Sequence, residues 1–285
     1  MDTFLLVSPN CGDLAAPNFE VKQFPDKENY IHIPSPENLK GKNVTILHRC
    51  YPDQDAGLIQ LLQVITVVKQ YASKVSAIVP YLPYSRQDHA VRSGEAETAK
   101  IVCSLLAKAG LDLLITFDCH FIKEGAGQHE YAGLKIDNRT LGPVLLEYVK
   151  PKVTDPVYIS PDVGASYMVE EAGGVAMEKQ RGDYAAGPTA FRQITKQKLD
   201  ISVTGKDVVV LDDMIEGGDT MVNAVSTCKR GGAKRIIAAA VHGLMVHNAF
   251  DRIRAAGARE VIVSDSVPGP AAVVSITSGL KDYLK

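Results

Sequence analysis

The sequence predicts an α/β protein of two domains, each built on a mainly parallel β-sheet flanked by helices. Short runs of β-branched residues alternate with longer amphipathic runs, which is the pattern of βα units. This alternation occurs twice along the chain, and 285 residues are enough for two domains of ordinary size. A hydrophobic content of 46% with 22% charged residues is typical of a globular protein with a large core.

In the first half, runs of apolar and β-branched residues predict four strands: 4–7, 43–49, 75–82 and 111–119. Helices are predicted over 57–72 and 95–110. The second helix ends well at Gly110, because glycine is favoured just after a helix and Lys108 suits the last turn.

The second half repeats the pattern with four further predicted strands: 156–162, 206–213, 235–243 and 259–266. A helix is predicted from Asp219 or Thr220 to Gly231. The halves join near residues 141–156, where Pro151 and Pro156 break a helical pattern. We therefore expect an N-terminal domain of residues 1–142 and a C-terminal domain of residues 143–285.

Charge and composition exclude several classes of partner. A net charge of −2 argues against bulk electrostatic binding to nucleic acid or an anionic membrane. No segment approaches the length of a membrane span, and the apolar run 4–7 is too short for a signal peptide. The five cysteines are odd in number and lack CxxC spacing, which indicates free thiols in a reducing, cytoplasmic location.

The stretch VVVLDDMIEGGDTM carries two adjacent carboxylates, Asp212 and Asp213, at the end of a buried strand. The amides of the turn that follows lie at a helix N-terminus, which favours an anion, and Gly217 and Gly218 allow close approach of a phosphate. The carboxylates would bind sugar hydroxyls, directly or through Mg²⁺. Helix capping is the alternative, but a cap needs only one carboxylate. The stretch therefore predicts a phosphate–sugar site.

This stretch resembles the loop of type I phosphoribosyltransferases and PRPP synthetases that binds 5-phosphoribosyl 1-pyrophosphate (PRPP). The resemblance implies that ribose 5-phosphate is bound by Asp212, Asp213, Glu216, Gly217, Gly218, Asp219 and Thr220. Three positions depart from the synthetase loop: Glu216 replaces Asp, Gly217 replaces Thr or Ser, and Asp219 replaces Gly. A carboxylate at position 219 is unfavourable beside a phosphate unless it points away or caps the helix.

The first half resembles the synthetases specifically. VPYLPYSRQDHAVRSGEAETAK is similar to their ATP-site segment, which implies nucleotide contacts by Arg86, Gln87, Asp88 and His89. The planar guanidinium of Arg86 suits bidentate pairing with phosphate. An isolated Arg-Gln-Asp run is usually a solvated turn, but here the whole segment matches.

KQFPDKENYIHIP resembles the synthetase segment that holds the adenine of ATP bound mainly by a neighbouring subunit. The matching residues are Phe24, Asp26 and Glu28, with Lys27 in place of the usual Gly. A loop phenylalanine is otherwise most often a packing anchor. The resemblance implies a homo-oligomer, a dimer or a hexamer of dimers, whose nucleotide site is shared between subunits.

Two strand ends match the family's Mg²⁺-linked positions. DCHF supplies His120, with Asp118 to orient it, and SPDVGAS supplies Asp162. The alternative for a lone histidine beside a strand is a structural role. One histidine with scattered carboxylates suits Mg²⁺, which keeps several waters, and does not suit zinc.

VAMEKQRGDYAAGPTAFRQITKQK is the longest polar and irregular stretch of the second half. Lys179 and Arg181 match the Lys-x-Arg of the synthetases' flexible catalytic loop, and Gly182 and Gly187 would give such a lid its mobility. Without the motifs on either side, a solvated surface would be the default interpretation.

The resemblance extends from about residue 4 to 280. It implies two type I phosphoribosyltransferase-like domains related by a pseudo-twofold axis, and ribose-phosphate pyrophosphokinase activity on ATP and ribose 5-phosphate with Mg²⁺. A phosphoribosyltransferase acting on a base would have no reason to carry YSRQDH or FPDKE. The stronger alternative is a non-catalytic regulatory or binding subunit of the same family. Such a subunit is expected to lose the Lys-x-Arg pair or His120, and both are present.

Overall fold

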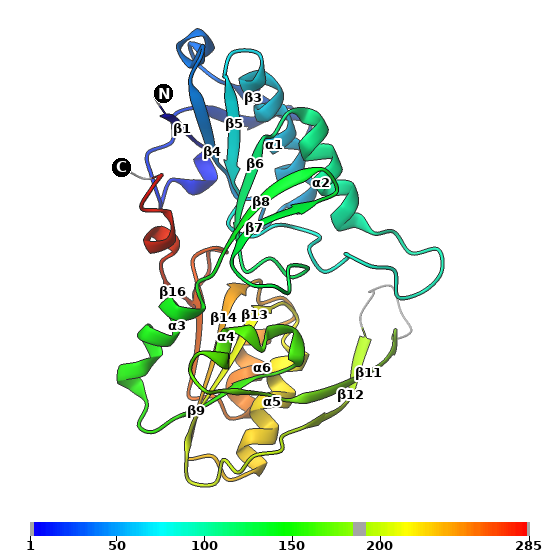
Figure 1. Cartoon of the computed structure of the whole chain (residues 1–285), viewed down its shortest axis with the longest axis vertical. Coiled ribbons are helices and arrows are strands. Elements are labelled where there is room, and N and C mark those ends of the chain that lie inside the picture. Colours follow the sequence, from blue (N-terminus) through cyan, green and yellow to red (C-terminus); the bar gives the residue numbers. More distant parts are fainter. Residues whose placement is uncertain (1–2, 185–191, 284–285) are drawn as a thin grey trace. The chain divides into compact units, whose positions relative to one another are not determined.

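The computed structural model describes residues 3–184 and 192–283 (Figure 1). The chain forms two compact units, one from residues 1–140 with 276–285 and one from residues 141–275. Each unit contains a parallel-stranded sheet with helices, which confirms the predicted α/β class. The sequence pattern did not predict that the C-terminal residues belong to the first unit.

The first unit has a six-stranded sheet in the order β1-β4-β5-β6-β8-β7. Its strands are β1 (Thr3–Val7), β4 (Asn43–Leu47), β5 (Lys74–Ile78), β6 (Leu113–Phe117), β7 (Gly127–Tyr131) and β8 (Leu134–Arg139). All neighbours are parallel except β7 and β8. The remaining elements are the hairpin β2 (Glu20–Gln23) and β3 (Asn29–His32), helices α1 (Gln54–Lys69) and α2 (Thr98–Ala109), and the 3₁₀ turns η1 (Pro9–Cys11), η2 (Pro36–Leu39) and η5 (Ile276–Leu280).

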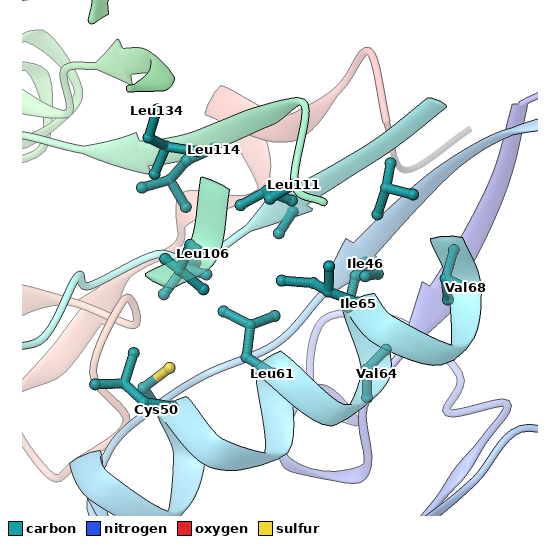
Figure 2. Packing of buried hydrophobic residues seen from close by; sticks show 14 of the residues in the cluster. Ile46, Cys50, Leu61, Val64, Ile65, Val68, Leu106, Leu111, Leu114 and Leu134 are labelled. Atoms are coloured by element: carbon teal, nitrogen blue, oxygen red, sulfur yellow. The ribbon is translucent and has the colours of Figure 1, made fainter. Parts of the chain in front are cut away.

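The core of this unit lies between the sheet and helix α1. Leu61, Val64, Ile65 and Val68 are completely buried and follow the i, i+3, i+4, i+7 spacing of one helical face. Figure 2 shows this face of α1 directed at the same cluster as Ile46 of β4. Helix α2 ends as predicted, since Gly110 adopts a left-handed φ of +105° after the last turn.

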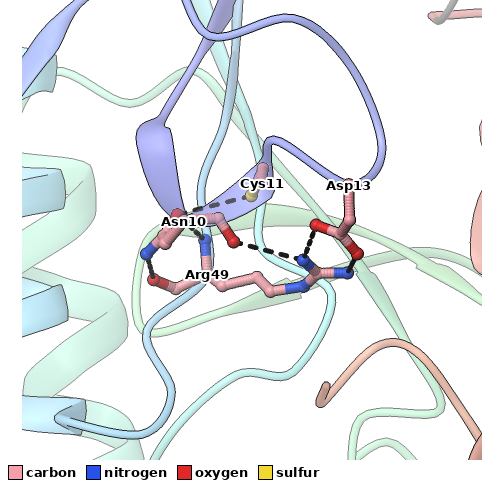
Figure 3. A network of polar contacts seen from close by, with 4 residues as sticks. All are labelled: Asn10, Cys11, Asp13 and Arg49. Atoms are coloured by element: carbon pink, nitrogen blue, oxygen red, sulfur yellow. Dashed lines mark hydrogen bonds and ion pairs between the residues drawn. The ribbon is translucent and has the colours of Figure 1, made fainter. Parts of the chain in front are cut away.

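A buried arginine holds the loop after β1 to the end of β4. Arg49 is 2% exposed, and its Nη1 and Nη2 atoms lie 2.5 and 3.0 Å from the two carboxylate oxygens of Asp13 (Figure 3). Its Nη1 atom also donates to the carbonyl of Asn10 at 3.1 Å. Burial by itself would raise the pKa of Asp13, but the hydrogen bonds and charge of Arg49 outweigh burial and lower it.

His48, next to this network, is buried in its neutral form. Its Nε2 atom lies 2.9 Å from the carbonyl of Gly57, and its Nδ1 atom lies 3.0 Å from the hydroxyl of Ser8. The carbonyl can only accept, so Nε2 carries the proton and Nδ1 accepts from Ser8. Burial lowers the pKa of His48 from 6.5 to about 4, because the charged imidazolium would lose its hydration.

This buried histidine makes acid unfolding steeper. A pKa that is lower in the folded state contributes stability above pH 6.5, which is lost as the pH falls from 6.5 to about 4. We expect His48 to account for about 3 kcal/mol of lost unfolding free energy over this range, at about 1.4 kcal/mol per pKa unit. Urea unfolding at several pH values should give a shallower pH slope for His48→Gln than for the unaltered chain. Equal slopes would contradict the assignment.

The second unit has a six-stranded, all-parallel sheet in the order β10-β9-β13-β14-β15-β16. Its strands are β9 (Val157–Ser160), β10 (Val175–Ala176), β13 (Asp207–Ile215), β14 (Arg235–Gly243), β15 (Glu260–Ser264) and β16 (Ala272–Val274). The other elements are α3 (Gly142–Val149), η3 (Lys150–Lys152), η4 (Val163–Ala165), α4 (Tyr167–Glu170), α5 (Asp219–Arg230) and α6 (Ala249–Ala256).

The strand order of this sheet changes direction at β9. The chain passes from β9 outward to β10, and β13 then pairs with the opposite side of β9. Such a reversal leaves a crevice at the carboxyl ends of the two strands, which is where open α/β sheets bind ligands. All nine residues of β13 are buried and the strand has parallel neighbours on both sides, so its predicted central position is confirmed.

The polar stretch predicted to be irregular instead forms an antiparallel ribbon of β11 (Glu178–Tyr184) and β12 (Arg192–Lys198). The sequence could not show this, because a mainly polar segment has no regular apolar alternation and such a ribbon is formed by backbone hydrogen bonds. Gly187 lies outside the described residues.

The predicted free thiols are confirmed, since all five cysteines are unpaired and buried. Burial raises the pKa of Cys11 and of Cys228 to about 12, so both stay protonated. Within residues 3–184 and 192–283, no helix has both the length and the apolar character needed to cross a membrane.

Candidate functional site

The carboxylates of the second unit that are predicted to bind ligands lie toward the carboxyl ends of β9 and β13, where the strand order reverses. Val210 of β13 pairs with Ile159 near the end of β9. Asp212 and Asp213 follow within β13, which continues to Ile215, and Asp162 lies just beyond the end of β9. The strand is thus longer than the sequence predicted, and the two aspartates lie inside it and not at its end. Asp212 and Asp213 are each 7% exposed. The amide of Asp213 donates to the Oδ1 atom of Asp212 at 3.0 Å. Carboxylates this deeply buried are stable only with hydrogen-bond donors or cations around them.

Asp162 also has a local structural role. Its Oδ1 atom accepts a hydrogen bond from the amide of Gly164 at 2.9 Å, which caps the short helix η4. The hydroxyl of Ser160 donates to the carbonyl of Asp162 at 2.6 Å. These two bonds fix the backbone that follows β9, so the carboxylate is held at the edge of the crevice.

The turn after β13 leads into α5, which begins at Asp219 and ends at Arg230, as predicted. Gly218 precedes the helix in the left-handed region, with φ of +83°. A Cβ atom at this position would lie 2.8 Å from the Cβ of Ala249, so glycine is required both by conformation and by space. At Gly217 an added Cβ would make ordinary contact, 3.6 Å from Nδ1 of His247.

The unfavourable negative charge at position 219 is paired with Arg252 of α6. Its Nη2 atom forms an ion pair with Asp219, and its Nη1 atom donates to the carbonyl of Gly217 at 2.8 Å. Asp219 is thus neutralised at the first position of α5, and the same guanidinium ties the turn to α6. Glu216 is exposed and Thr220 is the second residue of α5. Arg252 and His247 were not identified from the sequence. The unfavourable carboxylate at position 219 indicated that a cation should lie nearby, but the sequence did not show which residue supplies it.

In the first unit, the segment after β5 is anchored to two helices. Tyr84, in the left-handed region with φ of +62°, donates its hydroxyl to Asp55 of α1. Gln87 accepts from the hydroxyl of Thr98 at 2.7 Å through its side chain and from the amide of Ala99 at 3.1 Å through its carbonyl. Gln87 therefore holds this segment at the start of α2, where its neighbour Arg86 is exposed.

Tyr131 of β7 joins the segments that follow β5 and β6. Its hydroxyl donates to the carbonyl of Asp88 at 3.2 Å, and its ring stacks on Phe121 with centroids 4.4 Å apart. His89 is exposed, with Nδ1 2.9 Å from the carboxylate of Asp88. The structure therefore brings residues 86–89 to the same sheet edge as the residues around His120. Sequence reasoning missed Tyr131.

The position of His120 is set by the turn at Asp118. Asp118 is fully buried with φ of +38°, and it accepts from the hydroxyl of Thr140 at 2.8 Å. The next amide, of Cys119, donates to the side chain of Asn138 at 2.9 Å. The end of β6 is thus fastened to the end of β8, and His120 comes to lie half-buried directly after it.

The predicted metal ligands, one histidine and one aspartate, suit a cation that keeps much of its hydration. In the described part of the chain, no three His, Cys, Asp or Glu side chains are grouped so that they could hold a metal ion. Zinc sites use three or four such ligands, whereas Mg²⁺ takes one or two and fills its shell with water and substrate phosphates. Asp162, in the second unit, carries an oxygen ligand of the kind that Mg²⁺ prefers, and His120, in the first unit, carries a nitrogen ligand.

The predicted adenine-binding residues lie on the exposed hairpin of β2 and β3. Phe24 is 50% exposed, and its ring meets that of Tyr30 edge to face at 5.6 Å. The amide of Phe24 donates to the carbonyl of Glu28 at 2.8 Å, and that of Glu28 to Asp26 at 3.1 Å. Among the residues described, these three make hydrogen bonds and ring contacts only within the hairpin.

Lys27 at the hairpin tip adopts φ of +73°, the left-handed conformation that favours glycine. This explains why glycine is usual at this position in the resembling segment. The conformation costs a residue with a side chain about 1–2 kcal/mol. The tip conformation is therefore retained in this chain despite the substitution.

Lys179 and Arg181 lie two residues apart on β11. Their backbones pair with Gln197 and Ile194 of β12, and the register is irregular between residues 180 and 181. The pair is thus carried by a strand and not by an unstructured loop.

Family models match two parts of the chain. Residues 12–110 match the N-terminal domain of ribose phosphate pyrophosphokinase, and residues 188–279 match the phosphoribosyl synthetase-associated domain. Together the two matches include residues from both units.

Curated relatives and a solved structure extend the match to nearly the whole chain. A ribose-phosphate pyrophosphokinase of Sulfolobus acidocaldarius is 36% identical over 264 residues, covering 90% of this chain and 87% of the relative. That of Methanothermobacter thermautotrophicus is 32% identical over 268 residues, covering 93% and 90%. The crystal structure of phosphoribosylpyrophosphate synthetase from Mycobacterium smegmatis aligns with a TM-score of 0.79 at 25% identity, covering 100% of this chain and 98% of the other.

Proposed function

Because the chain belongs to the ribose-phosphate pyrophosphokinase family, we propose that it transfers the β,γ-pyrophosphoryl group of ATP to ribose 5-phosphate, giving PRPP and AMP. The observation that carries this proposal is the match to ribose-phosphate pyrophosphokinases over nine-tenths of the chain. The carboxylate pair at the β9–β13 crevice and the glycine turn beside it suit a phosphorylated sugar.

In this proposal the second unit binds ribose 5-phosphate. Asp212 and Asp213 accept hydrogen bonds from the ribose hydroxyls, and the amides of residues 216–220 receive the 5-phosphate at the N-terminus of α5. Arg252 supports this role, because its positive charge beside Asp219 offsets the repulsion between that carboxylate and the phosphate. Gly218 permits the close approach of the main chain.

The nucleotide would be held by Arg86, Gln87, Asp88 and His89, with Phe24, Asp26 and Glu28 from a second copy of the chain. O1 of the sugar attacks the β-phosphorus of ATP, and the bond from that phosphorus to the α-phosphate oxygen breaks to release AMP. Mg²⁺, when bound, neutralises charge on the phosphates, and His120 and Asp162 would hold it. Lys179 and Arg181 would stabilise the charge that develops on the transferred group. We assign no general base.

We further propose that the protein works in the cytoplasm as a homo-oligomer. The five unpaired cysteines support a reducing location. The exposed Phe24 hairpin supports contact with another subunit, since its own contacts leave half of the aromatic side chain in water.

The direct test is AMP release from ATP in the presence of Mg²⁺ and ribose 5-phosphate. We expect AMP and PRPP to form in equal amounts, and neither to form when the sugar is omitted. A chain that binds both substrates but releases no AMP would be a regulatory or binding subunit of the family, which is the alternative function.

Replacing Asp212 or Asp213 with asparagine should weaken ribose 5-phosphate binding by about tenfold or more, because a charged acceptor for a sugar hydroxyl contributes roughly 1.5–3 kcal/mol. Affinity for ATP should change far less. Isothermal calorimetry with each substrate separately measures both effects. Asp251→Asn, an exposed carboxylate of α6, is the matched control. Unchanged sugar affinity in both variants would refute the assignment.

A further inference from the structure

A cavity of about 710 Å³ lies in the second unit, at the amino-terminal edge of its sheet. Its lining includes the first residues of two neighbouring strands, Arg235 of β14 and Glu260 of β15, and Lys229 from the last turn of α5. The carboxylates Asp212 and Asp213 lie at the opposite, carboxyl-terminal end of the strands. The cavity is therefore separate from the proposed substrate site.

The lining carries a large excess of positive charge. Five of its residues are basic and one is acidic, although the whole chain has a net charge of −2. The basic residues are Lys152, Lys229, Lys234, Arg235 and Arg259. Helices α5 and α6 end nearby, and each C-terminus is equivalent to roughly half a negative charge. The two helix ends together carry about one negative charge, whereas the lining has four excess positive charges. Pairing of basic residues with the helix dipoles therefore does not account for the cluster.

Only some of these cations are neutralised within the protein. Lys152 pairs with Glu260 at 2.9 Å, and Arg235 lies 3.9 Å from Asp207 and also donates to the carbonyl of Lys152. The side chains of the other three form no hydrogen bond or ion pair with any described residue; these are Lys229, Lys234 and Arg259.

One of the three unneutralised cations, Lys229, is exposed and lies over the end of α6. A Cβ atom at Gly257 would lie 2.6 Å from Cδ and 3.4 Å from Nζ of Lys229. The Lys229 side chain thus lies directly over the residue that ends α6.

We propose that this cavity binds a chain of phosphates, either inorganic polyphosphate or the polyphosphate arm of a nucleotide. Its volume is within the roughly 300–1,000 Å³ typical of small-molecule sites, and its lining is charged where such sites are mostly apolar. Several cations spread around one cavity suit a ligand with several negative charges better than a single phosphate. Nucleic acid is disfavoured because the chain as a whole has a net charge of −2.

The test is titration of the ¹⁵N-labelled full chain with tripolyphosphate in EDTA, followed by amide NMR. We expect saturable shifts at Lys234, Gly257 and Arg259, and weaker binding at higher salt. The combined change Lys229→Gln, Lys234→Gln, Arg259→Gln should weaken binding by about tenfold or more. The control Lys40→Gln, Lys108→Gln, Lys135→Gln removes the same charge from exposed positions elsewhere and should leave the affinity unchanged.

The two ligand sources are distinguished by repeating the titration with metal-free ATP. Tighter binding of ATP than of tripolyphosphate at the same amides would identify a nucleotide, and equal or weaker binding would identify the phosphate chain itself. Absence of shifts with both ligands, equal affinity in the two triple variants, or orthophosphate binding as tightly as tripolyphosphate would overturn the proposal. Because no turnover is measured and residues 217–220 are observed separately, failure here leaves the proposed activity untouched.

Discussion

Replacing Lys179 or Arg181 with alanine is expected to lower kcat by about 10²-fold or more while KM for both substrates changes little. A cation that contacts the transferred group mainly in the transition state contributes several kcal/mol to lowering the barrier and little to ground-state binding. Both residues lie on β11 of the antiparallel ribbon, which belongs to the same unit as the Asp212–Asp213 crevice.

Steady-state release of AMP at saturating ATP and ribose 5-phosphate measures this effect. Lys198→Ala is the matched control, because Lys198 lies on β12 of the same ribbon, is exposed and pairs with Asp200 at 2.5 Å. An exposed ion pair contributes little to stability, so this variant should keep nearly full activity. Near-normal kcat in both test variants would remove Lys179 and Arg181 from the chemistry.

The strands that could be predicted are the ones buried on both faces. Val208–Val210 of β13 is a continuous apolar run because parallel strands in such a sheet are covered on each side. The edge strand β7, with sequence GQHEY, is half exposed, and β16 has only three residues. Neither contains enough apolar residues to produce a pattern, and the docking of residues 276–283 on the first unit depends on contacts that are remote in sequence.

The residues of the candidate site fall into the same two groups, those that the sequence identifies and those that it does not. Asp212 and Asp213 could be recognised as candidates because two adjacent charges in an otherwise apolar strand are costly to bury. Their supporting residues could not. Arg252 is 33 residues from Asp219, and Tyr131 is 43 residues from Asp88. From the sequence alone, an arginine on α6 cannot be distinguished from an ordinary solvated helix residue, because its contact with the turn depends on the fold. Sequence reasoning therefore identifies candidate ligand-binding groups more readily than the groups that position them.

The second large effect is expected when two differently mutated chains are combined, and it depends on the exposed hairpin of β2 and β3. Phe24 is half exposed, and Asn29 of β3 is hydrogen-bonded to Ala56, Gln60 and Gln63 of α1, so the hairpin is held on its own chain before any partner arrives. Stacking of adenine on an aromatic ring contributes roughly 1–3 kcal/mol. A Phe24→Ala, Glu28→Ala chain should therefore lose most activity at ATP concentrations below its own KM, and a Lys179→Ala chain should lose it through kcat.

Mixing these two defective chains should restore activity if the nucleotide site is shared between subunits. After unfolding and refolding together, about half of randomly formed dimers contain one chain of each kind, and one of the two sites in each mixed dimer is intact. The expected recovery is therefore about a quarter of normal activity. A chain carrying all three changes, mixed with the Lys179→Ala chain, should recover none, because no pairing supplies an intact site. Sedimentation at the assay concentration completes the test: a fully active monomer, or no recovery in the first mixture, would mean that each chain builds its own site.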